Sequence, residues 1–152
     1  MRKKRVLYQS DSAVAKTGFG RCSKALLTYL HNTGKYEIYH YVGGHRVGDD
    51  ALLDRTPWKS LGSLPDDPRE HQALQQDPNI ARRAAYGAHF LDKTIKEVKP
   101  DVYIAAQDIW GIDFCLEKPW WNKVSKNSLL WTTLDSRPIL PSAISAAEKT
   151  DN

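Results

Sequence analysis

The sequence predicts an α/β domain in which a parallel β-sheet carries helices on both faces. Short apolar runs typical of buried strands alternate with helical patterns, which is the order of elements in a parallel sheet. The 152 residues suit one domain with a hydrophobic core, spanning 1–152. The content of 41% hydrophobic and 26% charged residues is that of an ordinary globular protein.

The first half of the chain begins with a strand at Val6-Leu7-Tyr8, a continuous apolar run. A polar loop follows, and the first helix is expected to begin near Phe19 and to end near Gly34. The second strand, from Tyr36 to Val42, is rich in β-forming residues. The apolar stripe expected to bury the helix consists of Cys22, Ala25, Leu26, Tyr29 and Leu30.

The stretch from Gly43 to Asp77 is predicted to form long loops, with one short strand near Trp58 to Leu61. One long helix is expected after it, because Asp77-Pro78 is a typical helix start and Pro100 a typical stop. Its apolar residues are spaced four or three positions apart on one face: Ile80, Ala84, Ala88, Leu91, Ile95 and Val98.

The last part of the chain is predicted to add two strands and two helices. The strands are Asp101 to Gln107 and Asn127 to Asp135; a short helix from Ile109 to Leu116 separates them, and another begins in "SAISAAEK". Ligands of parallel sheets bind beyond the carboxyl ends of the strands. The polar segments at those ends are therefore candidate binding segments: Ser10 to Gly20, Gly43-Gly44-His45, Gln107-Asp108 and Asp135-Ser136-Arg137.

Charge and cysteine content argue against several classes of protein. The net charge of +4 comes largely from Arg2 to Arg5, a run typical of a solvated flank, with a nucleic-acid or membrane patch as the alternative. No signal-peptide core follows it, no stretch is long enough to span a bilayer, and nucleic acid is not an expected partner. Cys22 and Cys115 lack metal or redox spacing, as do the histidines, so we expect reduced, buried cysteines, no metal and a cytoplasmic location.

The segment "DSAVAKTGFGR", residues 11–21, places glycines before a predicted helix start, which suits a phosphate. A dinucleotide site is disfavoured, because its G-x-G-x-x-G fingerprint follows the strand directly. Here Gly18-Phe19-Gly20 comes late, Ser23 stands at the third glycine, and the second strand ends in Gly43-Gly44 without an acidic residue. A P-loop is excluded because no Gly-Lys-Ser/Thr follows.

Three segments in the same order resemble the N-terminal half of GT-B-fold, nucleotide-sugar-dependent glycosyltransferases (group 1, family 4-like). They are "KTGFGRCSKALLTYL", "KPDVYIAAQDIW" and "LLWTTLDSRPILPSAISAAEKTDN". The resemblance implies a Rossmann-like domain that contributes the acceptor side of a site between two such domains. The reaction would transfer a hexose from a nucleoside-diphosphate sugar to an acceptor hydroxyl, without a cofactor.

The second domain of these enzymes holds the donor nucleotide, and nothing in this sequence corresponds to it. The resemblance therefore implies a chain truncated at its C-terminus or one half of a split enzyme. A second Rossmann-like domain is expected in cis or in trans, and this chain alone is expected to be inactive.

On the donor side, the resemblance implies substrate contacts from Thr17, Gly18, Phe19, Gly20 and Arg21. The backbones of Gly18 and Gly20 would approach the diphosphate, so Gly20→Val would block transfer while leaving the fold largely intact. Four of these residues also have a structural interpretation. The alternative for the glycines is a turn without a ligand and for Thr17 a helix cap, while Arg21 either pairs with phosphate or faces water.

On the acceptor side, the resemblance implies that Gln107 and Asp108 bind acceptor hydroxyls and that His45 lines the cleft. Asp135 is the catalytic candidate, as a polar contact or as proton acceptor from the acceptor hydroxyl. Arg137 either binds phosphate or pairs with Asp135. The structural alternative for Asp108 and Asp135 is a helix N-cap or turn.

Two further alternatives stay open from the sequence. Trp110, Trp120 and Trp121 either stack on sugar rings or belong to a core or interface. The rival function is a non-catalytic Rossmann-like module that binds a phosphorylated ligand or a partner protein. An apolar surface exposed near the C-terminal end of the chain would favour the glycosyltransferase, whereas a self-contained sheet with polar edges would favour the module.

Overall fold

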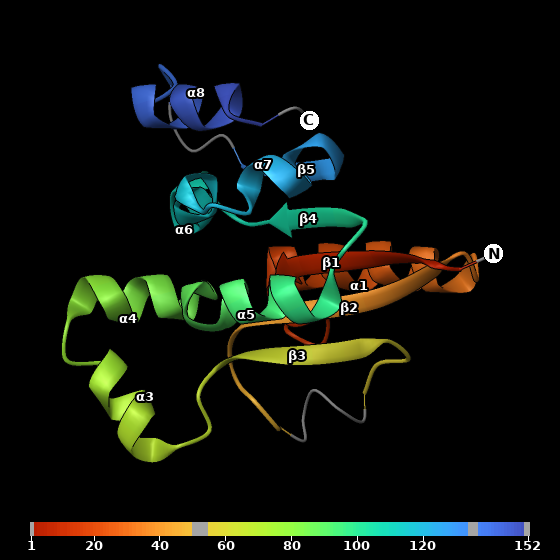
Figure 1. The fold of residues 1–152 in the computed structure, drawn as a ribbon, viewed down its shortest axis with the longest axis horizontal. Coiled ribbons are helices and arrows are strands. Elements are labelled where there is room, and N and C mark those ends of the chain that lie inside the picture. Colours follow the sequence, from red (N-terminus) through yellow and green to blue (C-terminus); the bar gives the residue numbers. More distant parts are fainter. Residues whose placement is uncertain (1, 50–54, 134–136, 151–152) are drawn as a thin grey trace.

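The structure, a computed structural model, describes residues 2–49, 55–133 and 137–150. Its sheet is parallel throughout and has five strands in the order β3-β2-β1-β4-β5, which confirms the α/β, Rossmann-like fold (Figure 1). The strands are β1 (Lys4–Ser10), β2 (Tyr36–Arg46), β3 (Lys59–Leu64), β4 (Val102–Ala106) and β5 (Ser128–Trp131).

Helices lie on both faces of this sheet. Figure 1 shows α5 in front of the strands and α1 behind them, with α4 and α6 toward the carboxyl ends of the strands. The helical elements are α1 (Gly18–Asn32), α3 (Pro68–Leu74), α4 (Pro78–Ala85), α5 (Ala88–Val98), α6 (Ile109–Ile112), η1 (Asp113–Glu117), α7 (Trp121–Val124), η2 (Ser125–Asn127) and α8 (Pro141–Glu148).

The two faces of the sheet form two separate hydrophobic cores. Alternate residues of β1 point to opposite faces, so Leu7 packs with α5 and Tyr8 packs with α1. The core on the α5 side also contains Tyr41, Tyr103 and Trp121. Because β1 is buried on both faces, consecutive residues at its centre are apolar, and the run Val6-Leu7-Tyr8 therefore identifies the strand from the sequence.

The first helix begins where the sequence predicts, but it buries a different face. The side chain of Thr17 caps it by accepting a hydrogen bond from the backbone N–H of Gly20. The buried residues of α1 are Gly20, Ser23 and Leu27, flanked by half-buried apolar side chains. Tyr29 is 69% exposed, so the predicted stripe is wrong by about one residue position around the helix.

The predicted long helix from Ile80 to Val98 is in fact two helices. Gly87 separates α4 from α5 in a left-handed conformation with φ of 99°, which ends one helix and starts the other. A Cβ at this position would lie 2.7 Å from Cε1 of Tyr41, whose hydroxyl donates a hydrogen bond to the Gly87 carbonyl. Tertiary packing thus selects a break that the apolar spacing alone does not reveal.

The region predicted as long loops contains more regular structure than expected. β2 runs on to Arg46, and β3 ends at Leu64 rather than near Leu61. A short helix, α3, then follows Asp67, whose carboxylate accepts hydrogen bonds from the backbone N–H groups of Arg69 and Glu70. Asp-Pro at a helix start is the signal that would have identified α3, since the same pair correctly predicts the start of α4.

Candidate functional site

The carboxyl ends of β1 and β4 are joined by the side chain of Asp11. Its Oδ1 accepts a hydrogen bond from Nε2 of Gln107 at 2.6 Å, and its Oδ2 accepts one from Oγ1 of Thr17 at 2.6 Å. Parallel neighbouring strands end at the same edge of the sheet, which is why residues 96 positions apart meet here. The structure therefore brings together two predicted site residues, Thr17 and Gln107, through a third that sequence reasoning did not single out.

Asp108 lies next to this group, at the start of α6. It occupies the N-cap position of that four-residue helix, but its side chain makes no capping hydrogen bond. Oδ1 of Asp108 instead accepts a hydrogen bond from the hydroxyl of Thr133, which follows β5. The carboxylate is therefore directed across the carboxyl ends of the strands. In this position its oxygens can accept hydrogen bonds from a ligand.

An aromatic pair borders the two carboxylates. The rings of Tyr86 and Trp110 meet edge to face with centroids 5.2 Å apart, and Trp110 is 45% exposed. Burial raises the pKa of the Tyr86 hydroxyl, and the negative charges of Asp108 and Asp11 raise it further. Both carboxylates therefore act electrostatically on the Tyr86 hydroxyl.

The glycines at the start of α1 differ in their surroundings. A Cβ on Gly20 would lie 2.5 Å from the carbonyl oxygen of Ala15 and 2.9 Å from that of Ser12. A Cβ on Gly18 would have no atom within 4 Å. Gly20 is thus required by packing, and the expectation that Gly20→Val leaves the fold intact is wrong, whereas Gly18 presents open backbone to solvent.

The helix start is already partly satisfied by the protein itself. The Gly20 N–H is bonded to Thr17 Oγ1, and Thr17 in turn donates to the Asp11 carboxylate. A phosphate here would benefit from the helix dipole but would meet the negative charge of Asp11. Arg21 is exposed on the first turn of α1. Among the residues predicted to contact the donor, it is the cation that could offset the charge of Asp11.

His45 lies near the end of β2, and its Nδ1 is 3.0 Å from Oδ2 of Asp49. A second histidine on the same strand, His40, is only 1% exposed and lies under the loop that carries Asp11. Nε2 of His40 donates to the Asp11 carbonyl oxygen at 3.1 Å, and its ring packs against Tyr8. The position of Asp11 therefore depends on a buried, neutral imidazole.

Burial of His40 makes the stability of the domain sensitive to acid. Burial lowers the pKa of His40 from 6.5 to about 4; the Asp11 carbonyl opposes this shift and the charge of His45 adds to it. The unfolded chain therefore binds an extra proton between pH 6.5 and about 4, and stability falls as the pH falls through that window. We expect a loss of about 3 kcal/mol, measured by urea unfolding across that range.

The matched control is His40→Gln, which keeps a donor to the Asp11 carbonyl but cannot be protonated. Its free energy of unfolding should be nearly constant where the parent protein loses stability. An equal acid dependence in both proteins would assign the effect to other groups.

Not all predicted residues join this site. Asp135 lies outside the described residues, whereas Arg137 is described and exposed. Trp121 is a core residue and Trp120 is half-buried, with its indole N–H donating to Oδ1 of Asp92. The interpretation of Trp120 and Trp121 as core residues is therefore confirmed. Trp110 is exposed and lies beside the site.

Two residues of the site, Asp11 and Tyr86, were not singled out from the sequence, although Asp11 lies within the candidate segment from Ser10 to Gly20. Asp11 immediately follows a buried strand, the same signal that identified Asp108, so the sequence contained the information. Tyr86 carried no such signal, because the apolar spacing placed it inside a continuous helix. Only the break at Gly87 brings the backbone and ring of Tyr86 to the strand ends, where its carbonyl accepts a hydrogen bond from Gln9.

The described residues contain no group of three or more histidine, cysteine or acidic side chains placed to hold a metal ion. The helices within 2–49, 55–133 and 137–150 include none with the length and apolar character of a membrane span. Cys22 and Cys115 are free, and Cys22 is only partly buried. No protein-family model, curated protein or solved structure matches the chain.

Proposed function

We propose that this chain is the acceptor-side domain of a glycosyltransferase that moves a hexose from a nucleoside-diphosphate sugar to an acceptor hydroxyl. The observation that carries the proposal is the grouping of Asp11, Gln107 and Asp108 at the strand ends beside the exposed ring of Trp110. The three segments that resemble this enzyme class support the same proposal.

The chemistry of this group suits a polyhydroxylated ligand. Ionised carboxylates accept hydrogen bonds from sugar hydroxyls, and the amide of Gln107 both donates and accepts. An exposed indole offers an apolar face to the C–H side of a sugar ring, as in sites that combine a few oriented polar groups with aromatic walls. A phosphate monoester fits less well beside two carboxylates.

Exposed apolar side chains support a second domain as partner. Ile104 and Ala106 face the α1 side of the sheet, and β5 pairs Leu129 and Trp131 with them. No described helix buries these two residues, which are 43% and 44% exposed. Three more large apolar side chains are exposed in the following segment: Ile139, Leu140 and Ile144. Apolar surface of this kind is typical of an interface.

The proposed reaction requires one proton acceptor. The acceptor oxygen bonds to the anomeric carbon, the bond from that carbon to the diphosphate breaks, and the diphosphate leaves with the electron pair. The hydroxyl proton passes to a carboxylate, for which Asp135 is the candidate. In this proposal, Asp11, Gln107 and Asp108 orient the acceptor and Gly18 presents its backbone toward the donor.

Binding of simple sugars to the isolated domain tests the proposal. The methyl glycosides of glucose, mannose and galactose serve as probes, and NMR follows the indole N–H resonances. We expect at least one glycoside to shift the Trp110 resonance with a dissociation constant in the millimolar range, because few hydrogen bonds and one stacking contact are available.

Trp131 provides a matched control for this experiment. It is 44% exposed against 45% for Trp110, so both indoles meet solvent to the same degree. Trp110→Ala should abolish the glycoside-dependent shifts of neighbouring backbone resonances, and Trp131→Ala should preserve them. Shifts produced by inorganic phosphate but by none of the glycosides would instead favour the phosphate-binding module.

A further inference from the structure

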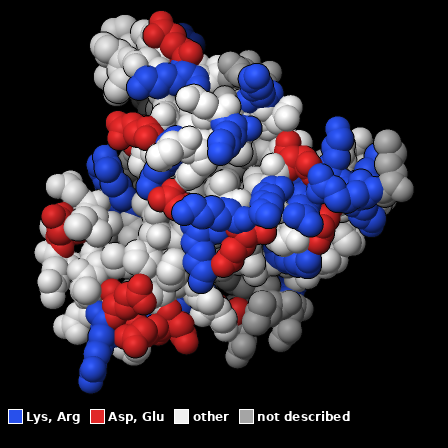
Figure 2. Space-filling model, viewed as in Figure 1, with Lys and Arg blue, Asp and Glu red and all other residues white. Residues whose placement is uncertain are grey.

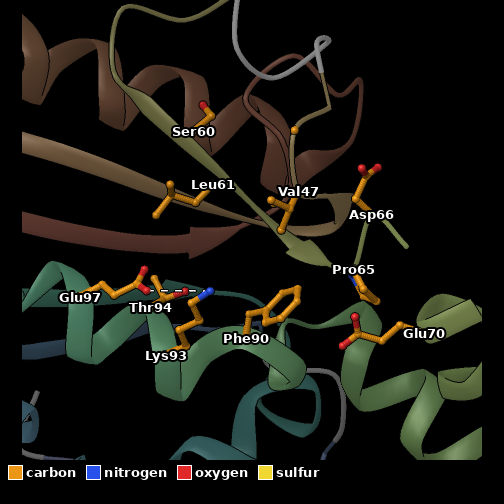
Figure 3. A pocket seen from close by; sticks show the side chains of 12 residues that line it. Val47, Ser60, Leu61, Pro65, Asp66, Glu70, Phe90, Lys93, Thr94 and Glu97 are labelled. Atoms are coloured by element: carbon orange, nitrogen blue, oxygen red, sulfur yellow. Dashed lines mark ion pairs between the residues drawn. The ribbon is translucent and has the colours of Figure 1, made fainter. Parts of the chain in front are cut away.

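A pocket of about 440 Å³ lies between the edge strand β3, the turn after β2 and helix α5 (Figure 3). Its floor is apolar and is formed by Val47, Leu61, Pro65 and Phe90. The volume is in the range of small-molecule sites. None of the residues grouped around Asp11 lines it, so the pocket is separate from the site of the proposed function.

The charged side chains around this pocket are mostly acidic. Asp66, Glu70 and Glu97 line it, and Lys93 is the one cationic lining residue among those described. Figure 2 shows the acidic side chains gathered over α3, the segment that begins after Asp67. The pocket thus carries an excess of negative charge within a chain whose net charge is +4.

The three acidic side chains differ in whether they form ion pairs with the protein. Glu70 contacts Nε2 of His89 at 3.0 Å, while Glu97 lies 3.9 Å from Nζ of Lys93. The carboxylate of Asp66 makes no hydrogen bond or ion pair with any described residue, although it lines the pocket. At least one carboxylate is therefore available at the end of the pocket opposite Glu97 (Figure 3).

The pocket already holds an ammonium group supplied by the protein. Nζ of Lys93 lies 5.9 Å from the centroid of the Phe90 ring, a cation–π distance, as well as near Glu97. The Lys93 side chain is 69% exposed and its ion pair is long, so this contact is weak and easily exchanged. An aromatic face with carboxylates on both sides is complementary to a cation.

We propose that this pocket binds a small organic cation, a primary amine attached to an apolar body. The body would occupy the floor at Leu61 and Phe90, and the ammonium would lie toward Asp66 and Glu70. The amine competes with Lys93 for the negative field of the pocket, so Lys93 limits the affinity. A carboxylate or phosphate ligand is disfavoured by three acidic groups against one lysine.

Three probes with the same ring test the charge selection. They are 2-phenylethylamine, the neutral 2-phenylethanol and the anionic 3-phenylpropionate, titrated while NMR follows the methyl resonances of Val47 and Leu61. We expect the amine to bind about tenfold more tightly than the alcohol, because it adds a charge-assisted hydrogen bond. The carboxylate should cause no shift.

Three variants test the residues themselves. Asp66→Asn combined with Glu70→Gln should weaken amine binding about tenfold, and Glu148→Gln, an exposed acid on α8 outside the pocket, should leave it unchanged. Lys93→Gln should strengthen amine binding about threefold by removing the competing ammonium. All four acidic and basic positions are exposed, so the variants should fold.

Equal binding of the three probes, no shift with the amine, or weaker amine binding in Lys93→Gln would overturn the proposal. These outcomes are independent of the glycoside titration, because the reporters Val47 and Leu61 line a pocket to which Trp110 does not contribute. Either proposal can thus fail while the other stands.

Discussion

Replacing Gly20 with valine is expected to lower the free energy of unfolding by about 3 kcal/mol or more. The first added carbon would overlap the carbonyl oxygens of Ala15 and Ser12, which are backbone atoms of a short, tight loop. These atoms cannot move aside without displacing Asp11 or the cap at Thr17. For a domain of this size, the melting temperature should fall by about 10 °C in thermal unfolding.

Gly18→Val is the matched control, two residues away in the same helix start. Its Cβ has no neighbour within 4 Å and Gly18 is exposed, so the expected change in stability is within about 0.5 kcal/mol. Equal losses for both variants would show that the loop does not hold Gly20 as the structure describes. In the presence of a donor domain, Gly18→Val is also the sharper test of backbone approach to a diphosphate, because it leaves the fold unchanged.

Asp135→Asn is expected to lower kcat about hundredfold when a donor-binding domain is supplied in cis or in trans. The substitution preserves the size of the side chain but removes the carboxylate that is proposed to take the acceptor proton. Asp11→Asn, in contrast, keeps an oxygen for Gln107 but loses the oxygen that accepts from the Thr17 hydroxyl. Because Asp11 is proposed only to orient the acceptor, this variant should raise KM for the acceptor with a smaller loss of kcat.

Steady-state kinetics with varied acceptor separates the two roles, and thermal unfolding provides the structural control. Both variants should melt within a few degrees of the parent protein. A kcat for Asp135→Asn close to that of the parent would exclude Asp135 as the proton acceptor. A kcat loss in Asp11→Asn as large as that expected for Asp135→Asn would assign the base to Asp11 instead.

The strand pattern was predictable because burial on both faces produces a recognisable composition. Val6-Leu7-Tyr8 and the run around Ile104 are apolar without alternation, and both are central strands of the sheet. The parallel arrangement then followed from the helices between them. Helix starts were equally visible where a side chain acts locally, as at Thr17 and Asp77.

What the sequence did not reveal depends on contacts between distant residues. The break at Gly87 exists because the Tyr41 ring occupies the space where a side chain would project, and no local pattern encodes this. The buried face of α1 is set by the packing of Leu27 against the sheet, and the apolar spacing alone points to Tyr29. The bridge from Asp11 to Gln107 likewise arises from strand order rather than from sequence neighbourhood.

The central position of β1 has a consequence for folding during synthesis. Its partner on one side, β2, follows closely, but its partner on the other side, β4, is made only after the whole β3 to α5 region. While the ribosome adds those residues, one edge of β1, whose centre is apolar, has no partner to hydrogen-bond. During this period the unpaired edge of β1 is open to pairing with another chain. A pause in translation before Val102 would lengthen the period, and rapid synthesis of β4 would shorten it.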